Sequence, residues 1–422
     1  MSAIDYLEER DLIERKSSEN LRAFLTTPRS FYIGFDPTAD SLHLGNLLGI
    51  IVAKALQNYG HKPYILVGGA TALIGDPSGK KTERTTISQA TVEDNTAQIL
   101  SFLSKIFSSE TADISPVIVN NYDWFFRLSA IDFLRDIGKY FRLGPMLGKE
   151  SVKARLESEE GMSFCEFSYQ VLQANDFHEL FSKGVSLQIG GSDQWGNMTA
   201  GIDFIRKKRQ EEAYALTFPL LTDAHGNKLG KTEKGAIWLD SKRMSPYEFY
   251  QSIMKTTDQD VIRLLKMLTF LPIEEIHQLE QEMKSSSYLP NQAQRRLAEE
   301  LTRFVHQKEG LEKALKVTKT ARPGTEARLS KEELEEIAQD IPSAVVSSIV
   351  AEKFSDVALK IGLVSSKSEA TRLVKNGGAY INNQRIQDPY YVFSDTDVIG
   401  GTFVLLSSGK KNRILVRIDS AR

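Results

Sequence analysis

The sequence predicts an α/β protein, with a parallel sheet in the first half, then an α-helical region and a small α+β region. Three observations support this fold class. Short apolar runs alternate with helical patterns at about 25 residues per unit, which is typical of βαβ units. The strand pattern is missing between residues 245 and 320. The last 70 residues differ from the rest in charge and carry their own turn and strand signals.

The expected sheet begins with a strand over Ser30–Phe35. Apolar residues at helical spacing follow from Leu44 to Tyr59 and end at Gly60. Further strands are expected over Pro63–Val67, Pro116–Val119 and Val185–Ile189, the last followed by Gly190-Gly191 and a helix through Arg209. These runs are apolar without alternation, so we expect helices on both faces of the sheet.

The next region is expected to be helical. Ser245-Pro246 opens a helix, because proline suits the first helical position. Further helical runs are expected at Val261–Leu268, Ile273–Met283 and Asn291–Val305. The polar segment Ala321–Arg328 contains Pro-Gly and is expected to be a linker. Beyond it, the turn signal Asn376-Gly377-Gly378 precedes short strands at Ala379–Ile381 and Phe403–Leu406. We therefore expect four parts, over 1–244, 245–322, 323–350 and 351–422.

Charge is unevenly distributed along the chain. The formal net charge is -2, which excludes a wholly basic nucleic-acid binder. From Lys353 to Arg422, however, eleven Lys and Arg stand against six Asp and Glu, leaving 42 against 49 in the preceding residues. This asymmetry suggests a nucleic-acid-binding tail on an acidic body. A small basic domain with solvated charges explains the charge equally well.

Several classes of protein are excluded by composition. The single cysteine, Cys165, cannot form an intramolecular disulfide or a cysteine-cluster metal site. No two of the six histidines are four residues apart, so no zincin-like helix is expected. The N-terminal residues lack the basic and apolar regions of a signal peptide, and no apolar stretch approaches 18 residues. We expect a soluble cytoplasmic protein without a dedicated metal site.

A polar string, Asp36–Asn46, lies between the first strand and its helix. In parallel sheets, ligands bind outside the carboxyl ends of the strands. His43 and Asn46 are three apart at the helix start and point the same way, and Gly45 leaves room for a ligand near the backbone. Free N–H groups at the helix start would suit phosphate. A histidine alone at this place would usually only cap the helix.

A second string, Lys228–Thr232, follows Phe218–Leu221. Its two lysines are three apart in a glycine-containing loop, so both can face one pyrophosphate. Their compact charges would stabilise charge that builds up on leaving oxygens. A lone loop of this kind is usually a solvated turn, so it gains weight only together with the first string.

The two strings resemble the HIGH and KMSKS signatures of class I aminoacyl-tRNA synthetases, here as HLGN and KLGKT. Longer blocks resemble the bacterial-type tyrosyl-tRNA synthetases in particular. These blocks are Gly34–Asn46, Leu66–Lys80, Asn120–Trp124, Phe167–Asp176, Leu187–Asn197, Lys228–Thr232 and Ser245–Tyr250. The resemblance spans essentially the whole chain and is loosest at the C-terminal end.

The resemblance implies a Rossmann-like nucleotide-binding catalytic domain at 1–244 and an α-helical tRNA-side domain at 245–322. It further implies a linker with a short helix at 323–350 and an αL-type RNA-binding domain at 351–422. The implied reaction needs no covalent nucleophile. Tyrosine attacks the α-phosphate of ATP, and the tyrosyl-adenylate then reacts with the 3′ end of tRNA. Mg²⁺ is expected to accompany ATP without an all-protein site. The implied partners are tRNA(Tyr) and a second copy in a homodimer.

The resemblance also implies site residues. Positions for the substrate phenol are Tyr32 and Asp176, since a buried hydroxyl needs a donor and an acceptor. Other positions for tyrosine are Asp36, Asp76, Asn121, Tyr169, Gln173, Gln188 and Gln194. ATP positions are Gly34, His43, Gly45, Asn46, Gly190, Asp193 and Lys231. The expected catalytic groups are Thr38, His43, Asn46, Lys80, Arg84, Lys228, Lys231 and Thr232. Expected RNA contacts are Lys367, Arg372, Lys375, Lys410, Lys411 and Arg413.

Some alternatives stay open at the level of sequence. Tyr169, Gln173 and Asp176 share one helical face, which is usually solvent-exposed, and Asp76 alone would suit an Asp-Pro turn. Asn46 stands where the signature has histidine, and it cannot become a cation. A catalytically idle RNA-binding protein would show decay of the ATP strings, of which Asn46 is the only hint. A synthetase for tryptophan would not need a paired tyrosine and aspartate for its indole.

Overall fold

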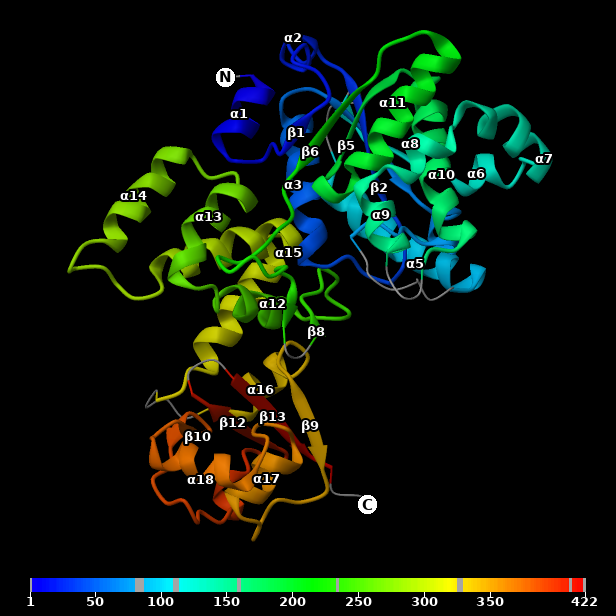
Figure 1. Ribbon diagram of the computed structural model, residues 1–422. Coiled ribbons are helices and arrows are strands. Elements are labelled where there is room, and N and C mark those ends of the chain that lie inside the picture. Colours follow the sequence, from blue (N-terminus) through cyan, green and yellow to red (C-terminus); the bar gives the residue numbers. More distant parts are fainter. Residues whose placement is uncertain are drawn as a thin grey trace. The chain divides into compact units, whose positions relative to one another are not determined.

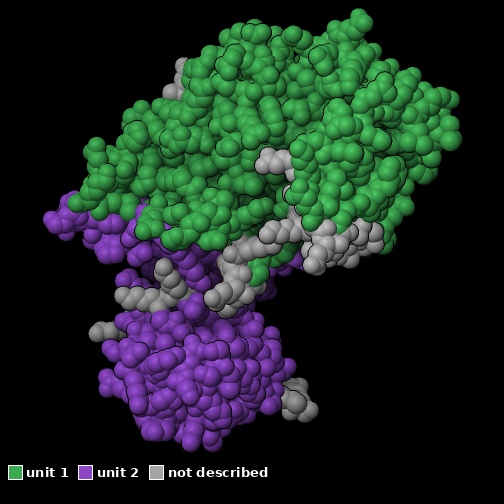
Figure 2. All heavy atoms as spheres, viewed as in Figure 1, with its two compact units in different colours: residues 1–240, 259–284 green, residues 241–258, 285–422 purple. Residues whose placement is uncertain are grey.

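The computed structural model shows how these segments assemble (Figure 1). The described residues are 2–79, 87–108, 114–157, 161–232, 235–324, 329–409 and 412–419. The chain divides into two compact units (Figure 2). The first comprises Met1–Asp240 and Gln259–Lys284, and the second comprises Ser241–Asp258 and Ser285–Arg422.

A six-stranded sheet forms the centre of the first unit, in the order β1-β6-β5-β2-β3-β4. The strands are β1 (Arg15–Lys16), β6 (Tyr214–Phe218), β5 (Val185–Gly191), β2 (Ser30–Phe35), β3 (Lys62–Val67) and β4 (Val117–Asn120). All neighbours are parallel except β1, which is antiparallel to β6. The four predicted strands are thus confirmed to within two residues at either end. Strands β1 and β6 were not predicted.

Helices cover the sheet, as Figure 1 shows. The predicted helix behind the first strand is α3 (Leu44–Asn58), whose apolar residues are almost all buried. The long helices α10 (Phe164–Phe181) and α11 (Trp195–Arg209) pack together. Gly201 of α11 lies directly against Phe177 of α10, and the absence of a side chain there permits this close approach. Shorter or peripheral helices are α1 (Ala3–Glu9), α2 (Leu21–Phe24), α4 (Thr71–Ile74), α5 (Gln89–Ile106), α6 (Tyr122–Phe125), α7 (Ala130–Asp132), α8 (Leu143–Leu147), α9 (Glu150–Leu156), α13 (Asp258–Leu268) and α14 (Ile273–Met283).

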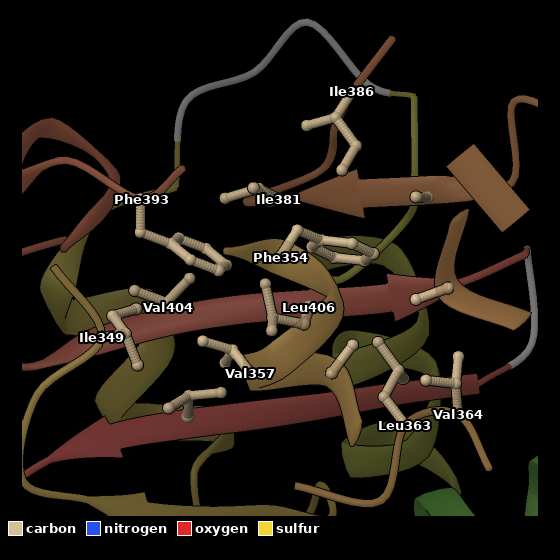
Figure 3. Close-up of a cluster of buried hydrophobic side chains, with 14 of the residues drawn as sticks. Ile349, Phe354, Val357, Leu363, Val364, Ile381, Ile386, Phe393, Val404 and Leu406 are labelled. Atoms are coloured by element: carbon tan, nitrogen blue, oxygen red, sulfur yellow. The ribbon is translucent and has the colours of Figure 1, made fainter. Parts of the chain in front are cut away.

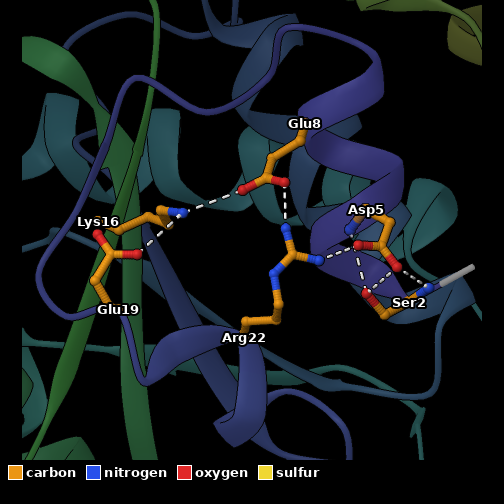
Figure 4. A network of polar contacts seen from close by, with 6 residues as sticks. All are labelled: Ser2, Asp5, Glu8, Lys16, Glu19 and Arg22. Carbon is orange, nitrogen blue, oxygen red and sulfur yellow. Dashed lines mark hydrogen bonds and ion pairs between the residues drawn. The ribbon is translucent and has the colours of Figure 1, made fainter.

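Both faces of the N-terminal helix α1 make contacts within the first unit. Its inner face buries Ile4 and Leu7 completely. On its outer face, the guanidinium of Arg22 bridges Asp5 and Glu8, and Lys16 Nζ lies 3.1 Å from Glu8 (Figure 4). Because these charges are partly exposed, the buried apolar side chains contribute most of the stability.

The second unit contains helices and a five-stranded sheet in the order β11-β10-β12-β13-β9. Its strands are β9 (Ser343–Val346), β10 (Ala379–Ile381), β11 (Gln384–Arg385), β12 (Phe403–Ser408) and β13 (Asn412–Ile418). Its helices are α12 (Pro246–Ile253), α15 (Gln292–Thr320), α16 (Lys331–Ile337), α17 (Phe354–Lys360) and α18 (Lys367–Lys375). Phe354, Val357, Phe393 and Leu406 form part of an apolar core between helices and sheet (Figure 3). The predicted α+β character of this region is confirmed. The stretch 323–350, expected to be a linker with a short helix, also supplies β9, which pairs with β13 and is part of the sheet.

Helix α12 begins at Pro246 behind a Ser245 cap, as predicted. Helices α13 and α14 lie within the expected helical region, yet they group with the first unit. In the described part of the chain, no helix combines the length and apolarity needed to cross a membrane.

Candidate active site

A cavity of about 410 Å³ opens where β2 and β5 end. Both signature strings contribute to its wall. The expected site residues that line it are Tyr32, Gly34, Asp36, Thr38, His43, Gly45, Asn46, Asp76, Tyr169, Gln173, Asp176, Gln188, Gly190, Asp193, Gln194 and Lys228. Residues more than 190 positions apart therefore meet around one space, which is large enough for a small ligand.

Asp176 lies in this cavity and is held by two donors. Asn121 Nδ2 donates to one carboxylate oxygen at 3.0 Å, and Trp124 Nε1 donates to the other at 2.9 Å. Burial outweighs these two hydrogen bonds and raises the pKa of Asp176 to about 8. Trp124 lies within one of the resembling blocks, but it was not predicted as a site residue. An aromatic N–H has no sequence pattern that reveals its acceptor.

Two buried polar atoms in the cavity have no partner among the described residues. They are the hydroxyl of Tyr32, which is 1% exposed, and Oε1 of Gln188, which is 3% exposed. Tyr32 and Gln188 are opposite each other on β2 and β5. Burial, with a smaller effect from the charge of Asp176, raises the pKa of Tyr32 well above its usual value. Buried polar groups without partners are costly, so these two atoms point to polar groups of a ligand.

Asp36 is held in a second arrangement at the end of β2. Its carboxylate accepts hydrogen bonds from Tyr169 Oη and from Thr71 Oγ1, each at 2.7 Å. A Cβ on Gly68 would lie 1.9 Å from Asp36 Oδ1, so only glycine permits this approach. Burial, followed by the charge of Asp36, raises the pKa of Tyr169 well above its usual value. Tyr169 is therefore a neutral donor.

A polar network forms the next part of the wall. Gln194 Nε2 donates to Asp76 Oδ2 at 2.7 Å, and the backbone N–H of Ser78 donates to Asp76 Oδ1 at 2.9 Å. Asn197 Nδ2 lies 3.1 Å from Gln173 Oε1 and 3.2 Å from Ser78 Oγ. Asp76 thus makes the local bond to Ser78 that a turn residue makes, and it also holds the side chain of Gln194 from a distant segment. Ser78 and Asn197 were not predicted from the sequence.

His43 caps helix α3 and is itself held in place. Its Nδ1 accepts from the backbone N–H of Gly45 at 3.1 Å, which leaves Nε2 as the protonated ring nitrogen. Asn46 Oδ1 accepts from the backbone N–H of His43 at 3.0 Å, so the amide nitrogen of Asn46 is its remaining donor group. Asparagine at position 46 therefore keeps a capping box at this helix start.

The expectation of free N–H groups at the start of α3 is wrong. The first helical N–H, of Leu44, donates to Ile237 O at 2.8 Å. The next, of Gly45, is used by His43 Nδ1, and that of Asn46 lies 2.8 Å from His43 O. The carbonyl group of Ile237, far along the chain, accepts from the N–H of Leu44, so these backbone N–H groups are already used within the protein.

The second string lies against the first. Gly230 has φ +108°, and a Cβ on it would lie 3.0 Å from Gly45 N. Lys228 Nζ and Asp193 Oδ2 both lie beside Gly79, at 3.6 and 3.4 Å from the place where a Cβ would be. Burial, followed by the charge of Asp76, raises the pKa of Asp193, and these two effects outweigh the charge of Lys228, which lowers it. The structure thus brings two signatures, 185 residues apart, into backbone contact.

Some expected groups have no described side chain. Lys231 and Thr232 form strand β7, paired with β8 (Gly235–Ala236), and only their backbone is described. Lys80, Arg84, Lys410 and Lys411 lie outside the described residues.

The remaining expected RNA contacts lie in the second unit. Lys367, Arg372 and Lys375 are exposed on α18, and Lys367 Nζ pairs with Asp356 at 2.5 Å. Arg413 differs, because it is buried and donates to Tyr247 Oη at 2.6 Å. Its guanidinium is engaged inside the unit.

The chain is similar to known proteins over almost its whole length. A family model described as tRNA synthetases class I (W and Y) matches residues 25–321. A second, described as Tyrosine--tRNA ligase SYY-like C-terminal domain, matches residues 333–416. A tyrosine--tRNA ligase of Protochlamydia amoebophila is 48% identical over 99% of both chains. The chloroplastic/mitochondrial tyrosine--tRNA ligase of Arabidopsis thaliana is 50% identical over 99% of this chain and 84% of its own.

Solved structures share the fold. A C-terminally truncated mitochondrial tyrosyl-tRNA synthetase of Aspergillus nidulans superposes with a TM-score of 0.66 at 33% identity, covering 74% of this chain and 92% of its own. A tryptophanyl-tRNA synthetase of Plasmodium falciparum has the same fold, with a TM-score of 0.55 at 16% identity over 78% of this chain and 87% of its own.

Proposed function

The chain belongs to the class I tRNA synthetases for tryptophan and tyrosine and, within them, to the tyrosine–tRNA ligases; from this premise we propose how its own residues perform the reaction. It is an ATP-dependent ligase that activates tyrosine and charges tRNA(Tyr). The single observation that supports our assignment of the pocket is the unpartnered hydroxyl of Tyr32 near the carboxyl group of Asp176.

We assign the substrate phenol to Tyr32 and Asp176. The phenol O–H can donate to one group and accept from the other, which satisfies the buried Tyr32 hydroxyl. Phenylalanine would leave the Tyr32 hydroxyl unpaired, although Asp176 would keep its hydrogen bonds from Asn121 and Trp124. An indole N–H can donate to one of the two groups but cannot accept from the other. This arrangement favours tyrosine over the two other aromatic amino acids.

The ammonium group of the substrate is assigned to Asp76, Tyr169 and Gln173. Asp76 supplies a negative charge, and Gln194 holds it in one orientation. Gln173 and Tyr169 are one helical turn apart on α10, so both can approach one cation. Gln188 and Asn121 support the same pocket, Asn121 through its hydrogen bond to Asp176.

The first chemical step joins the tyrosine carboxylate to the α-phosphorus of ATP. A carboxylate oxygen forms the new P–O bond while the bond to the bridging oxygen of the leaving pyrophosphate breaks. We propose that His43 Nε2–H, the amide of Asn46 and the ammonium of Lys228 stabilise the charge that develops on phosphate oxygens. Thr38 would donate to the same phosphates, and Asp193 would accept from a ribose hydroxyl. Catalysis is then positioning and charge stabilisation.

Mg²⁺ is proposed to arrive with ATP. Among the described residues, no three His, Cys, Asp or Glu side chains form a group that could hold a metal ion. Phosphate oxygens and water are the ligands that Mg²⁺ prefers at sites of this kind. The bound ion would neutralise phosphate charge, and the protein side chains above would orient the reacting groups.

Transfer to tRNA follows as the second step. A hydroxyl of the 3′-terminal ribose attacks the adenylate carbonyl carbon, and AMP leaves. We propose that the C-terminal region 351–422 contributes phosphate contacts through Lys367, Arg372 and Lys375, which are exposed on one helix. Affinity for tRNA would then fall with rising salt concentration.

We also propose a homodimer. Large apolar side chains are strongly exposed along one stretch of the first unit: Phe126, Ile131, Leu134, Leu143, Leu147, Leu156 and Phe164. Exposed apolar groups of this size mark interaction surfaces. Light scattering of the wild type and of a Leu143→Glu variant tests this proposal, because the variant should shift the protein to the mass of one chain.

A cytoplasmic location is the last part of the proposal. It is supported by bacterial relatives such as the ligase of Klebsiella pneumoniae, 46% identical over 98% of this chain and 97% of its own, and by the single cysteine. Because the Arabidopsis relative is named for organelles, fractionation of cells that express a tagged chain is the appropriate test.

The pocket assignment is tested by ATP–pyrophosphate exchange with tyrosine, phenylalanine and tryptophan. Exchange with tyrosine alone is expected. An equal rate with phenylalanine would refute the roles of Tyr32 and Asp176. Loss of all exchange from a folded protein would instead favour an RNA-binding protein without catalytic activity.

A further inference from the structure

The hairpin at 221–229 carries Lys228 and is built around one carboxylate. Asp223 Oδ1 accepts from the backbone N–H of His225 at 2.9 Å and of Asn227 at 2.8 Å. Its Oδ2 accepts from Asn227 Nδ2 at 3.0 Å. These bonds organise the turn locally, before any substrate contact is made.

The two limbs of this hairpin are tied together beside the turn. The backbone N–H of Leu229 donates to Leu221 O at 2.8 Å. Thr222 and Lys228 face each other in an antiparallel bridge. The backbone of Lys228 is therefore held in register with Thr222, and anything that anchors Thr222 also anchors Lys228.

Such an anchor is present on helix α13. The guanidinium of Arg263 donates to the carbonyl oxygen of Thr222. The same guanidinium lies 3.3 Å from Asp260 Oδ1, whose side chain is 6% exposed. A charged donor on a carbonyl makes a stronger bond than a neutral one, and the carboxylate of Asp260 orients it.

Helix α13 is firmly fixed within the first unit. At its C-terminal end, the buried guanidinium of Arg10 donates to Lys266 O at 3.0 Å and to Thr269 O at 2.7 Å. The ammonium of Lys266 pairs with Asp11 at 2.5 Å. Arg10 thus satisfies carbonyl groups that the end of a helix leaves open. Arg263 therefore connects a rigid element to the base of the hairpin.

We propose that Arg263 is a positioning residue for Lys228 in the tyrosine-activation step. By anchoring Thr222, it keeps the Lys228 ammonium beside Gly79 and Asp193, where the cavity would hold the polyphosphate. This inference rests on the role proposed above for Lys228. Arg263 itself does not line the cavity, so it acts only through the hairpin.

The test is a double-mutant cycle in ATP–pyrophosphate exchange. Arg263→Ala should lower kcat about tenfold and leave the KM for tyrosine unchanged, because small misplacements of a catalytic group cost rate rather than ground-state binding. Arg263→Lys retains a cationic donor, so its kcat should be at most about threefold below that of the wild type, which is half of the loss on a logarithmic scale. In a Lys228→Ala background, Arg263→Ala should change kcat less than twofold. Gln259→Ala, an exposed position on the same helix, is the matched control.

Each outcome supports or overturns the proposal. Equal effects of Arg263→Ala in both backgrounds would overturn it, as would a wild-type kcat in the single variant. A fall in the thermal midpoint to well below that of Gln259→Ala, with no recovery by Arg263→Lys, would show a purely structural role and also overturn it. If Lys228→Ala alone left kcat unchanged, the proposed role of Lys228 would fail first, and the cycle would identify that failure separately.

Discussion

Two buried tyrosines allow one chemical change to be tested with opposite expected results. Tyr32 Oη has no partner among the described residues, whereas Tyr169 Oη donates to Asp36 at 2.7 Å. Tyr32→Phe removes an unsatisfied group and should stabilise the ligand-free protein by about 1 kcal/mol. Tyr169→Phe removes a hydrogen bond to a carboxylate and should destabilise it by about 1.5–3 kcal/mol. Thermal unfolding without ligands measures both.

Activity should separate the same two variants. Tyr32→Phe should reduce the preference for tyrosine over phenylalanine about tenfold, since one hydrogen bond to the substrate hydroxyl is worth about 1.4 kcal/mol. Tyr169→Phe should raise the KM for tyrosine without admitting phenylalanine. The reasoning fails if Tyr32→Phe destabilises the protein as much as Tyr169→Phe, or if it leaves the ratio of kcat/KM values unchanged.

Because Asp176 has a folded-state pKa of about 8, above its ordinary value, stability should fall as pH rises from 4 to 8, and Asp176→Asn should flatten that slope in thermal midpoints. Burial lowers the pKa of His61 to about 4, so stability should fall by roughly 2 kcal/mol as pH drops from 6.5 to 4; His61→Gln should remove this loss in urea titrations. Gly68→Ala should displace Asp36 and raise the KM for tyrosine at least tenfold in exchange assays, and an unchanged KM would contradict the steric reason for glycine there.

The central elements could be predicted because their signals are local. The apolar runs of β2, β3, β4 and β5 and the periodicity of α3 identify strands and a helix without knowledge of their neighbours. Strand β6 was missed because the polar residue Thr217 interrupts its apolar run, and only the folded sheet shows that Thr217 is fully buried. Strand β1 consists of only two residues, too few for any pattern.

The candidate site was predicted less evenly. Most expected residues for tyrosine and ATP do line one cavity. Trp124, Ser78 and Asn197 were missed, since each contributes through a hydrogen bond to a residue that is distant in sequence. Arg413 is the reverse case, a residue expected to contact RNA because it lies in a basic segment. Its side chain is instead buried and donates to Tyr247, which only the packing of the folded chain reveals.

The sequence by itself determined the family, the order of the strands along the chain and the spacing of the two signature strings, because these properties belong to contiguous residues. The tertiary structure decided which polar groups have a hydrogen-bond partner within the protein and which, such as the hydroxyl of Tyr32, have none among the described residues. Asp36 and Tyr169 are 133 residues apart, and Asp76 and Gln194 are 118 apart, so no local pattern links them. The protonation of Asp176 was decided in the same way. Burial sets its pKa, and burial is a property of the folded chain as a whole.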